Sequence, residues 1–508
     1  MLKQRIICAL LVVCLACAAG LAGAEEETER SFIMAGFDAT TYSDWLNNRF
    51  FMRMEERTGV HFVLRQSKTE ADWAGVKASL KPGAEGMPDV LFKAALSTQE
   101  CVDLRANGVL IDLKPYLEEN CPNLMALIHE NPEILELITL PDGSVAALPF
   151  ITALPEQNYM YINQKWLNNL GLSMPTNTEE LEAVLIAFRD RDPNRNGKND
   201  ETPLSFEGPF DLKFLAHGFG LIANDYQIFE EDGKVRFMPT EKNYRAFVEW
   251  CRRLYEENLL DKNGFSALVS MYYGTENNDA SATVGMVMTY LVGSIYRASW
   301  SNEYVIMPPL VYEGRQVYRE FAMPVTRGCF AITSACKDPA LMLQWVDYLY
   351  SEEGATLALA GAENVEYVVD GDGTWRLTDS QQSEYERALS TVDGGARIPG
   401  IENIEFQSRY GASAELRQSL EGQTAFQQYV VRPFPAVYLT PEQQAEIAPL
   451  QAKIGEYTDV MFGRWVTGDE EISDASFIRF EETLNELGLQ EFLDFWQRVL
   501  DQQKGGSM

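Results

Sequence analysis

Three short apolar runs near the N-terminus decide the fold class: SFIMAG at 31–36, HFVLR at 61–65 and PDVLF at 88–92. Each run has the length and composition of a buried strand. The segments between them, 45–58 and 73–80, are predicted to form helices. Strands that alternate with helices build βαβ units, so the sequence predicts an α/β fold with a largely parallel sheet.

The same alternation starts again near residue 159. Residues 159–163 are predicted to form a strand, and residues 166–170 a helix that Gly171 ends. Thr178 is the expected N-cap of the next helix, because a hydroxyl there can accept a bond from the first turn. Apolar residues at 181, 184, 185 and 188 then follow the helical period and predict one buried face. A second α/β unit therefore follows the first.

Further along the chain, the pattern becomes more helical. Helices are expected at 244–259 and 339–350, strands at 285–290 and 329–333, and an almost wholly helical segment beyond residue 440. The fold class predicted is thus α/β with two lobes and a helical C-terminal part.

Composition excludes several classes of function. The chain has 508 residues, with 42 Lys and Arg against 75 Asp and Glu, giving a formal net charge of −33. Such a charge repels phosphate backbones, so nucleic acid is not an expected partner. With only three histidines in the sequence, a His-rich metal centre is also not expected.

Residues 1–24 have the features of a secretory signal peptide. Two basic residues precede an uncharged apolar run at 6–19, and the small residues AGA at 22–24 follow it. The run is shorter than the ~20 residues that a transmembrane helix needs. We therefore expect export to the periplasm or the cell surface, with cleavage after Ala24. Lipid attachment at Cys17 is the alternative, because Cys17 follows Leu15 and Ala16 as in part of a lipobox.

Five cysteines lie after this leader, at positions 101, 121, 251, 329 and 336. An odd number leaves at least one thiol unpaired in an oxidising compartment. Buried apolar thiols are the favoured interpretation, and a Cys101–Cys121 disulfide is the alternative.

One loop has the spacing of a metal site. Residues 192–203 read DPNRNGKNDETP, which places side-chain oxygens at loop positions 1, 3 and 5 and Gly197 at position 6, as in the D-x-[DN]-x-[DN]-G calcium loop. Pro203 stands where the usual bidentate Glu would be, and Glu201 is the substitute. Because calcium prefers hard oxygen donors, the predicted ligands of a structural Ca²⁺ are Asp192, Asn194, Asn196, the Lys198 carbonyl, Asp200 and Glu201. A solvated Asn/Gly turn is the alternative. The similar letters DGDG at 370–373 lie between two strands and predict a hairpin turn instead.

Several stretches together resemble the extracellular solute-binding proteins of family 1, which serve bacterial ABC importers. They are DGSVAALP at 142–149, YINQKWLNNLGL at 161–172, PTNTEEL at 175–181, MPDVLF at 87–92, LYEENLLD at 254–261, GAENVEY at 361–367 and the segment 457–468. The calcium-like loop is similar to that of the large subgroup containing alginate-binding and other oligosaccharide-binding proteins.

This resemblance implies a two-lobe, type II periplasmic-binding-protein fold whose chain crosses between the lobes. We expect one lobe from residues 25–153 and 324–385, and the other from 154–323 and 386–508. The hinge is expected at 149–155 and 311–323, and the calcium ligands carry over onto the loop residues given above.

Ligand residues are expected where strands end at the cleft, because ligands of open α/β sheets bind there. Sugars need aromatic faces for stacking and polar side chains for their hydroxyls. The candidates are Asp38, Phe150, Tyr290, Arg409 and Tyr410.

The predicted function is capture of a carbohydrate, in particular an oligosaccharide, by a monomeric binding protein that delivers it to ABC transporter permease subunits without chemical change. The alternative is a secreted glycoside hydrolase with paired carboxylates. A sensor that signals to a membrane kinase would share the same structure. The sequence does not identify the sugar.

Overall fold

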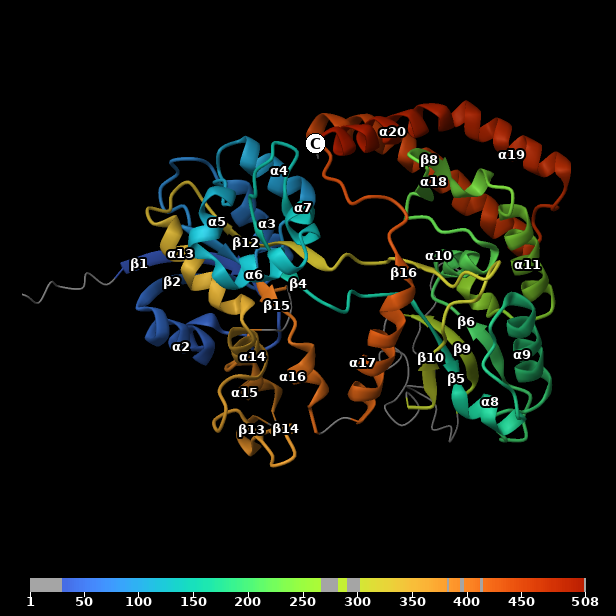
Figure 1. Cartoon of the computed structure of the whole chain (residues 1–508), viewed down its shortest axis with the longest axis horizontal. Coiled ribbons are helices and arrows are strands. Elements are labelled where there is room, and N and C mark those ends of the chain that lie inside the picture. Colours follow the sequence, from blue (N-terminus) through green and yellow to red (C-terminus); the bar gives the residue numbers. More distant parts are fainter. Residues whose placement is uncertain are drawn as a thin grey trace, which may run out of the picture.

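The chain folds into two α/β lobes joined by crossing segments (Figure 1). The structure is a computed structural model that describes residues 30–265, 282–289, 302–381, 383–392, 397–411 and 414–506. Its mixed α/β architecture confirms the predicted fold class.

The first lobe contains a six-stranded sheet with the order β15-β4-β12-β3-β1-β2. Its strands are β1 (Arg30–Phe37), β2 (Val60–Ser67), β3 (Val90–Phe92), β4 (Leu148–Ile151), β12 (Val325–Ile332) and β15 (Gly400–Ile401). β1 runs parallel to both β2 and β3, as the three N-terminal apolar runs predicted. β12 runs antiparallel to β3 and β4, because the chain enters it from the second lobe.

Helices cover this sheet with apolar side chains. They are α2 (Arg49–Thr58), α3 (Glu70–Ser79), α4 (Thr98–Ala106), α5 (Lys114–Asn120), α6 (Pro122–Glu130), α7 (Glu133–Ile138), α13 (Pro339–Asp347) and α14 (Glu352–Ala360). α2, for example, turns Phe50, Phe51 and Met54 into the core. The lobe is completed by the hairpin β13 (Tyr367–Val369) and β14 (Trp375–Leu377), with α15 (Glu384–Ala388) and α16 (Ile404–Ser408) beside it (Figure 1). The turn at 370–373 is therefore the hairpin turn that was predicted.

The second lobe is built on a four-stranded sheet with the order β10-β5-β9-β6. Its strands are β5 (Tyr159–Asn163), β6 (Thr202–Ser205), β9 (Val284–Thr289) and β10 (Tyr304–Ile306). β6 and β9 are parallel, whereas β5 is antiparallel to both β9 and β10, so this sheet is mixed where a parallel one was expected.

The helices of the second lobe are α8 (Gln164–Leu170), α9 (Thr178–Asp190), α10 (Pro209–Leu212), α11 (Tyr244–Glu256) and α17 (Ala414–Phe426), and the small sheets β7 (Ile228–Glu231) with β8 (Lys234–Phe237) and β11 (Tyr318–Arg319) with β16 (Val430–Val431) complete the lobe. Three of these helices, α8, α9 and α11, lie where the sequence predicted them, whereas α10 and α17 were not predicted. Gly171 ends α8 with a left-handed φ of 66°. The expected N-cap of α9 was wrong by one residue: Asn177 accepts the bond from Glu180, since its β conformation directs the side chain at the first turn, and Thr178 is already helical.

Three long helices form the C-terminal part, as predicted. α18 (Pro441–Thr467), α19 (Asp474–Leu487) and α20 (Leu489–Gly506) pack together and onto α11. Figure 1 shows them along the upper side of the second lobe, with α20 reaching toward the first. None of the helices in the described ranges is long and apolar enough to cross a membrane.

The segments that join the lobes lie near the expected hinges. One runs from β4 to β5, and a second from β11 to β12. A third leaves the first lobe after α16. The expected return at residue 386 is too early, because β15 still pairs with β4 and Tyr410 still bridges to Trp375. We propose that the first lobe extends to about residue 411 and otherwise keep the predicted division.

The cysteines do not form the Cys101–Cys121 disulfide considered above. All five thiols after the leader are free. Cys101 packs in the cluster around Trp73 and Leu91, whereas Cys121 lies in a different cluster and approaches the Leu343 carbonyl. Burial raises the pKa of the Cys101 thiol to about 12, so this thiol stays protonated and unreactive.

His217 makes the stability of the second lobe depend on pH. The ring is buried, with Nδ1 2.6 Å from the Phe214 carbonyl and Nε2 accepting a bond from the Leu310 N–H at 2.8 Å, so it is held neutral. Burial lowers its pKa to about 4, from 6.5. Between pH 6.5 and pH 4, His217 binds a proton in the unfolded chain but stays neutral in the folded chain. Folding stability therefore falls as the pH falls.

We therefore expect the wild-type chain to lose about 3 kcal/mol more stability than His217→Gln between pH 6.5 and pH 4, as measured by urea unfolding. Comparing the two slopes removes the contribution of the carboxylates, which both chains share. Parallel pH profiles for the two chains would contradict the assignment.

Candidate ligand-binding site

The carboxyl ends of strands from both lobes lie next to the crossing segments. In the first lobe, β1, β2 and β3 are parallel and end together, and β4 leads directly to the second lobe. In the second lobe, the ends of β6 and β9 lie beside the start of β5. Since β5 starts where the chain arrives from the first lobe, these two edges are the natural walls of a ligand site.

Asp38 follows β1 and is held by protein donors. Its carboxylate accepts bonds from Lys93 Nζ at 2.9 Å, from Ser43 Oγ at 3.0 Å and from the Thr40 N–H at 3.0 Å. The Lys93 ammonium is fully buried and also donates to the Val392 carbonyl. Burial by itself would raise the pKa of Asp38, but Lys93 and the Thr40 bonds outweigh it and lower the pKa. Lys93 thus connects Asp38 to Val392. The role of Asp38 in ligand contact stays a prediction.

Phe150, Arg409 and Tyr410 have neighbours other than those of Asp38. Phe150 is buried in β4 with the Arg397 guanidinium 5.0 Å from its ring centroid. Tyr410 packs on Trp375, with ring centroids 4.5 Å apart, and Arg409 beside it is exposed. Tyr290 lies outside the described residues. Arg409 and Tyr410 are thus brought together with Trp375, at the end of α16.

An exposed aromatic pair that the sequence did not predict lies at the carboxyl edge of the sheet in the first lobe. Tyr42, five residues after β1, meets Tyr385 of α15 edge-to-face with centroids 5.7 Å apart, and both side chains are about half exposed. Tyr42 has a φ of 67°, which is unfavourable for a bulky residue. No sequence signal joins two tyrosines 343 positions apart.

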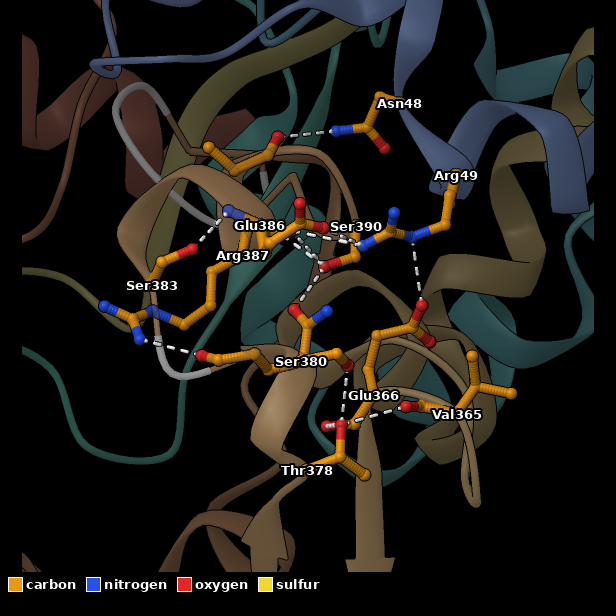
Figure 2. Close-up of polar contacts among 12 residues, drawn as sticks. Asn48, Arg49, Val365, Glu366, Thr378, Ser380, Ser383, Glu386, Arg387 and Ser390 are labelled. Carbon is orange, nitrogen blue, oxygen red and sulfur yellow. Dashed lines mark hydrogen bonds and ion pairs between the residues drawn. The ribbon is translucent and has the colours of Figure 1, made fainter.

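A polar network fixes the segment that carries Tyr385 (Figure 2). Asn48 donates to the carbonyls of Ala388 and Thr391, at 3.0 and 2.8 Å. Arg49 donates to the buried Glu366 carboxylate at 3.1 Å and also reaches Glu386. Because these donors sit at the start of α2, α15 is held against the first lobe.

A second exposed aromatic group stands at the edge of the second lobe. Phe210 lies five residues after β6, and Phe321 lies in the crossing from β11 to β12. Their rings are 6.3 Å apart, both contact Phe214, and each is about two-fifths exposed. The buried Arg319 guanidinium lies 4.0 Å from the Phe214 ring centroid and donates to the Ala223 carbonyl and to Asp225. Each lobe therefore presents exposed aromatic rings after the carboxyl end of a sheet strand, β1 in the first lobe and β6 in the second.

The predicted calcium loop connects α9 to β6 and is folded by its own side chains. Asp192 accepts bonds from the N–H groups of Asn196 and Gly197, both at 3.1 Å. Asn196 accepts from the Lys198 N–H at 2.7 Å. Gly197 has a φ of 73°, the left-handed turn that the pattern requires. All six predicted ligand residues therefore belong to one tight loop.

Glu201 is the unusual member of this loop. Both oxygens of its carboxylate are buried, and neither has a hydrogen-bond partner among the described residues. Burial raises the pKa of Glu201, and the nearby Asp200 and Asp192 raise it further. Within the described ranges, no three His, Cys, Asp or Glu side chains are gathered as metal ligands. Any ion here would therefore also need the Asn and carbonyl oxygens.

A pair of α/β lobes joined by several crossings is the architecture of the solute-binding proteins of ABC transporters, and comparison with known proteins supports this class. No family model matches the chain. The chain is 27% identical over 479 residues to FusA of Streptococcus pneumoniae, a fructooligosaccharide ABC transporter substrate-binding protein, covering 89% of this chain and 86% of FusA.

Solved structures agree with this likeness. A solute-binding protein from Bifidobacterium longum infantis, described as binding human milk oligosaccharides, superposes with a TM-score of 0.77 at 19% identity, covering 94% of this chain and 99% of the other. An EF-hand mutant of FusA gives 0.67 at 23% identity, covering 94% and 100%. The alginate-binding protein AlgQ2, solved without calcium ion, gives 0.63 at 19% identity, covering 94% and 98%.

The chain is thus similar to substrate-binding proteins of ABC transporters, in agreement with the resemblance drawn from its motifs. These relatives are binding proteins and not enzymes. The comparisons therefore favour a binding protein over a glycoside hydrolase.

Proposed function

We propose that the chain is the extracytoplasmic substrate-binding protein of an ABC importer and that it captures an oligosaccharide between its lobes. The observation that carries this proposal is the presence of exposed aromatic rings that follow a sheet strand in each lobe, Tyr42 with Tyr385 after β1 and Phe210 with Phe321 after β6. Aromatic faces stack on the C–H surfaces of sugar rings, and rings on both lobes suit a ligand of more than one sugar unit.

The mechanism of capture is closure of the two lobes around the sugar. The crossings are short, so a small rotation there moves a whole lobe. Ligand is released unaltered, because the proposal requires no bond to break. The closed, ligand-bound chain would then be presented to the permease subunits as a monomer outside the membrane. FusA and the Bifidobacterium protein support this proposal by the activities in their names.

We further propose that the loop at 192–201 holds a structural calcium ion. Asp192, Asn194, Asn196, the Lys198 carbonyl, Asp200 and Glu201 would supply its oxygens. The buried, unpaired carboxylate of Glu201 beside two aspartates fits this role, since a divalent cation would offset two of the three negative charges. The ion would hold the end of α9 close to the start of β6, and the chain continues from β6 to the exposed Phe210.

Export and anchoring are part of the same proposal. A substrate-binding protein acts outside the cytoplasm, in agreement with the signal-peptide features of residues 1–24. We keep cleavage after Ala24 as the proposed processing and acylation of Cys17 as its alternative. The mass of the exported protein distinguishes the two.

A panel of nystose, lacto-N-tetraose and trigalacturonate tests the proposed ligand class by isothermal titration calorimetry. We expect stoichiometric binding of at least one of these oligosaccharides, without turnover. For that sugar, Tyr385→Ala and Phe321→Ala should each weaken binding by about tenfold to a hundredfold, because each truncation removes a stacking face.

The matched control is Tyr116→Ala, which removes a similarly exposed aromatic ring from α5 and should leave affinity unchanged. Binding by the wild-type chain with no loss in either test variant would show that the sugar lies elsewhere. Hydrolysis of a panel member would overturn the proposed function itself.

A further inference from the structure

One ion-paired group joins the two lobes away from the predicted ligand residues. Arg432 follows the hinge strand β16, and its guanidinium forms two bonds with Glu320 at 2.6 and 2.7 Å. Glu320 follows β11, and its N–H donates to the Val431 carbonyl at 2.8 Å. Arg432 is therefore fixed at the side of the second lobe.

The same guanidinium also reaches the first lobe. Its third nitrogen pairs with Glu133, the first residue of α7, which lies 299 positions away in sequence. The Arg432 side chain is only 21% exposed, so water screens the pair in part. Glu133 and Arg432 thus form a direct polar link between lobes that must stretch or break when the lobes rotate.

The surroundings of this link leave room for such a rotation. A cavity of about 300 Å³ lies beside it, lined by α7 on one side and by Glu230, Pro433 and Ala436 on the other. A larger cavity of about 610 Å³ continues between α5, α7 and the ends of α18 and α20. The lobes also touch beside these cavities, where the Arg327 guanidinium of β12 lies 3.8 Å from the Tyr438 ring centroid and Ala436 packs against the core of the first lobe. The polar link is therefore one of several contacts that resist their movement.

The link lies on the opposite side of the crossings from the predicted ligand residues at α16. Figure 1 shows α7 and the segment from β16 to α18 above the crossings, and α16 with α17 below them. A rotation about the crossings that closes one side opens the other. A contact on the upper side therefore holds the lobes against closure on the lower side.

We propose that the Glu133–Arg432 pair sets the affinity of this protein for its ligand by opposing lobe closure, without either residue touching the ligand. This inference rests on the proposed function. Affinity falls when the binding-competent conformation is less populated, so weakening the pair raises the population of closed chain and tightens binding. The pair acts on the position of the lobes, and other residues contact the sugar.

The test measures binding of the panel sugar by calorimetry for the wild type, Glu133→Gln and a control. Glu133→Gln should lower the dissociation constant by about threefold to tenfold. The control is Glu446→Gln, which breaks the exposed pair with Arg498 inside the C-terminal helices and removes the same charge without joining lobes. The control should leave the dissociation constant unchanged.

The dependence of ligand affinity on ionic strength is a second measurement, and it would be the same in both chains if the pair were only structural. Because salt screens the pair, wild-type affinity should rise between low and moderate ionic strength, and this rise should be absent in Glu133→Gln. An unchanged or weakened affinity in Glu133→Gln would overturn the inference while leaving the proposed function intact.

If no panel sugar binds the wild-type chain, small-angle scattering still decides the inference. Glu133→Gln should then give a more compact average shape than the wild type and Glu446→Gln. Identical curves for the three chains would overturn it.

Discussion

Removal of calcium is expected to lower the melting temperature of the chain by on the order of 10 °C. An ion present at a thousand times its dissociation constant stabilises the folded state by about 4 kcal/mol, and each kcal/mol is worth about 2–4 °C in a lobe of this size. Without the ion, Glu201 is left buried beside Asp192 and Asp200, with its pKa raised by burial and by both neighbours. Differential scanning calorimetry with EGTA, followed by calcium, measures the loss and its recovery.

Two variants make this experiment specific. Asp192→Ala removes a predicted ligand and should melt like the EGTA-treated wild type, with no response to calcium. Asp372→Asn is the matched control, because Asp372 belongs to the similar DGDG stretch that forms the β13–β14 hairpin turn. Its response to calcium should equal that of the wild type. A wild-type melting temperature unaffected by EGTA, with no heat on titration with calcium, would establish the alternative of a solvated turn.

Lys93→Met is expected to cost about 3–5 kcal/mol of folding stability, because it leaves the Asp38 carboxylate buried without its counter-charge. Lys93 and Asp38 are 2.9 Å apart and both side chains are almost completely buried. The ammonium also donates to the Val392 carbonyl, which would lose that donor. Urea unfolding at pH 7 measures the change in the free energy of unfolding.

The double variant Asp38→Asn with Lys93→Met separates charge from packing. It should recover part of the loss, because no unpaired charge then remains in the interior. Lys213→Met is the matched control: Lys213 pairs with Asp459, whose side chain is 62% exposed, so the cost should stay below about 1 kcal/mol. Equal costs for Lys93→Met and Lys213→Met would show that burial of the carboxylate left behind adds nothing to the loss.

The sequence alone predicted the calcium loop, but it did not predict the pair of Lys93 with Asp38. The calcium loop was visible as a spacing of oxygen-bearing residues, because a short loop must bring its ligands together by its own turns. Lys93 was not visible as the partner of Asp38. The pair forms because β1 and β3 are parallel neighbours in the sheet, so the residues that follow them meet at one edge.

The site depends even more on tertiary structure. Tyr42 meets Tyr385 because the network from Asn48 and Arg49 draws α15 onto α2. Phe210 meets Phe321 because the crossing from β11 passes the end of β6. Of the five predicted ligand residues, Arg409 and Tyr410 lie near an aromatic cluster, whereas Asp38 and Phe150 are buried.

The sequence by itself determined the alternation of strands and helices that begins each lobe, the buried face of α9, the glycine that ends α8 and the loop suited to calcium. Each of these follows from residues within one or two turns of one another, whose periodicity and side-chain chemistry act locally. Only the tertiary structure decided which aromatic rings stand at the lobe edges and that Arg432 links the lobes through Glu133. Those neighbours are hundreds of residues apart, and they meet because the chain crosses between lobes in a particular topology that no local pattern encodes.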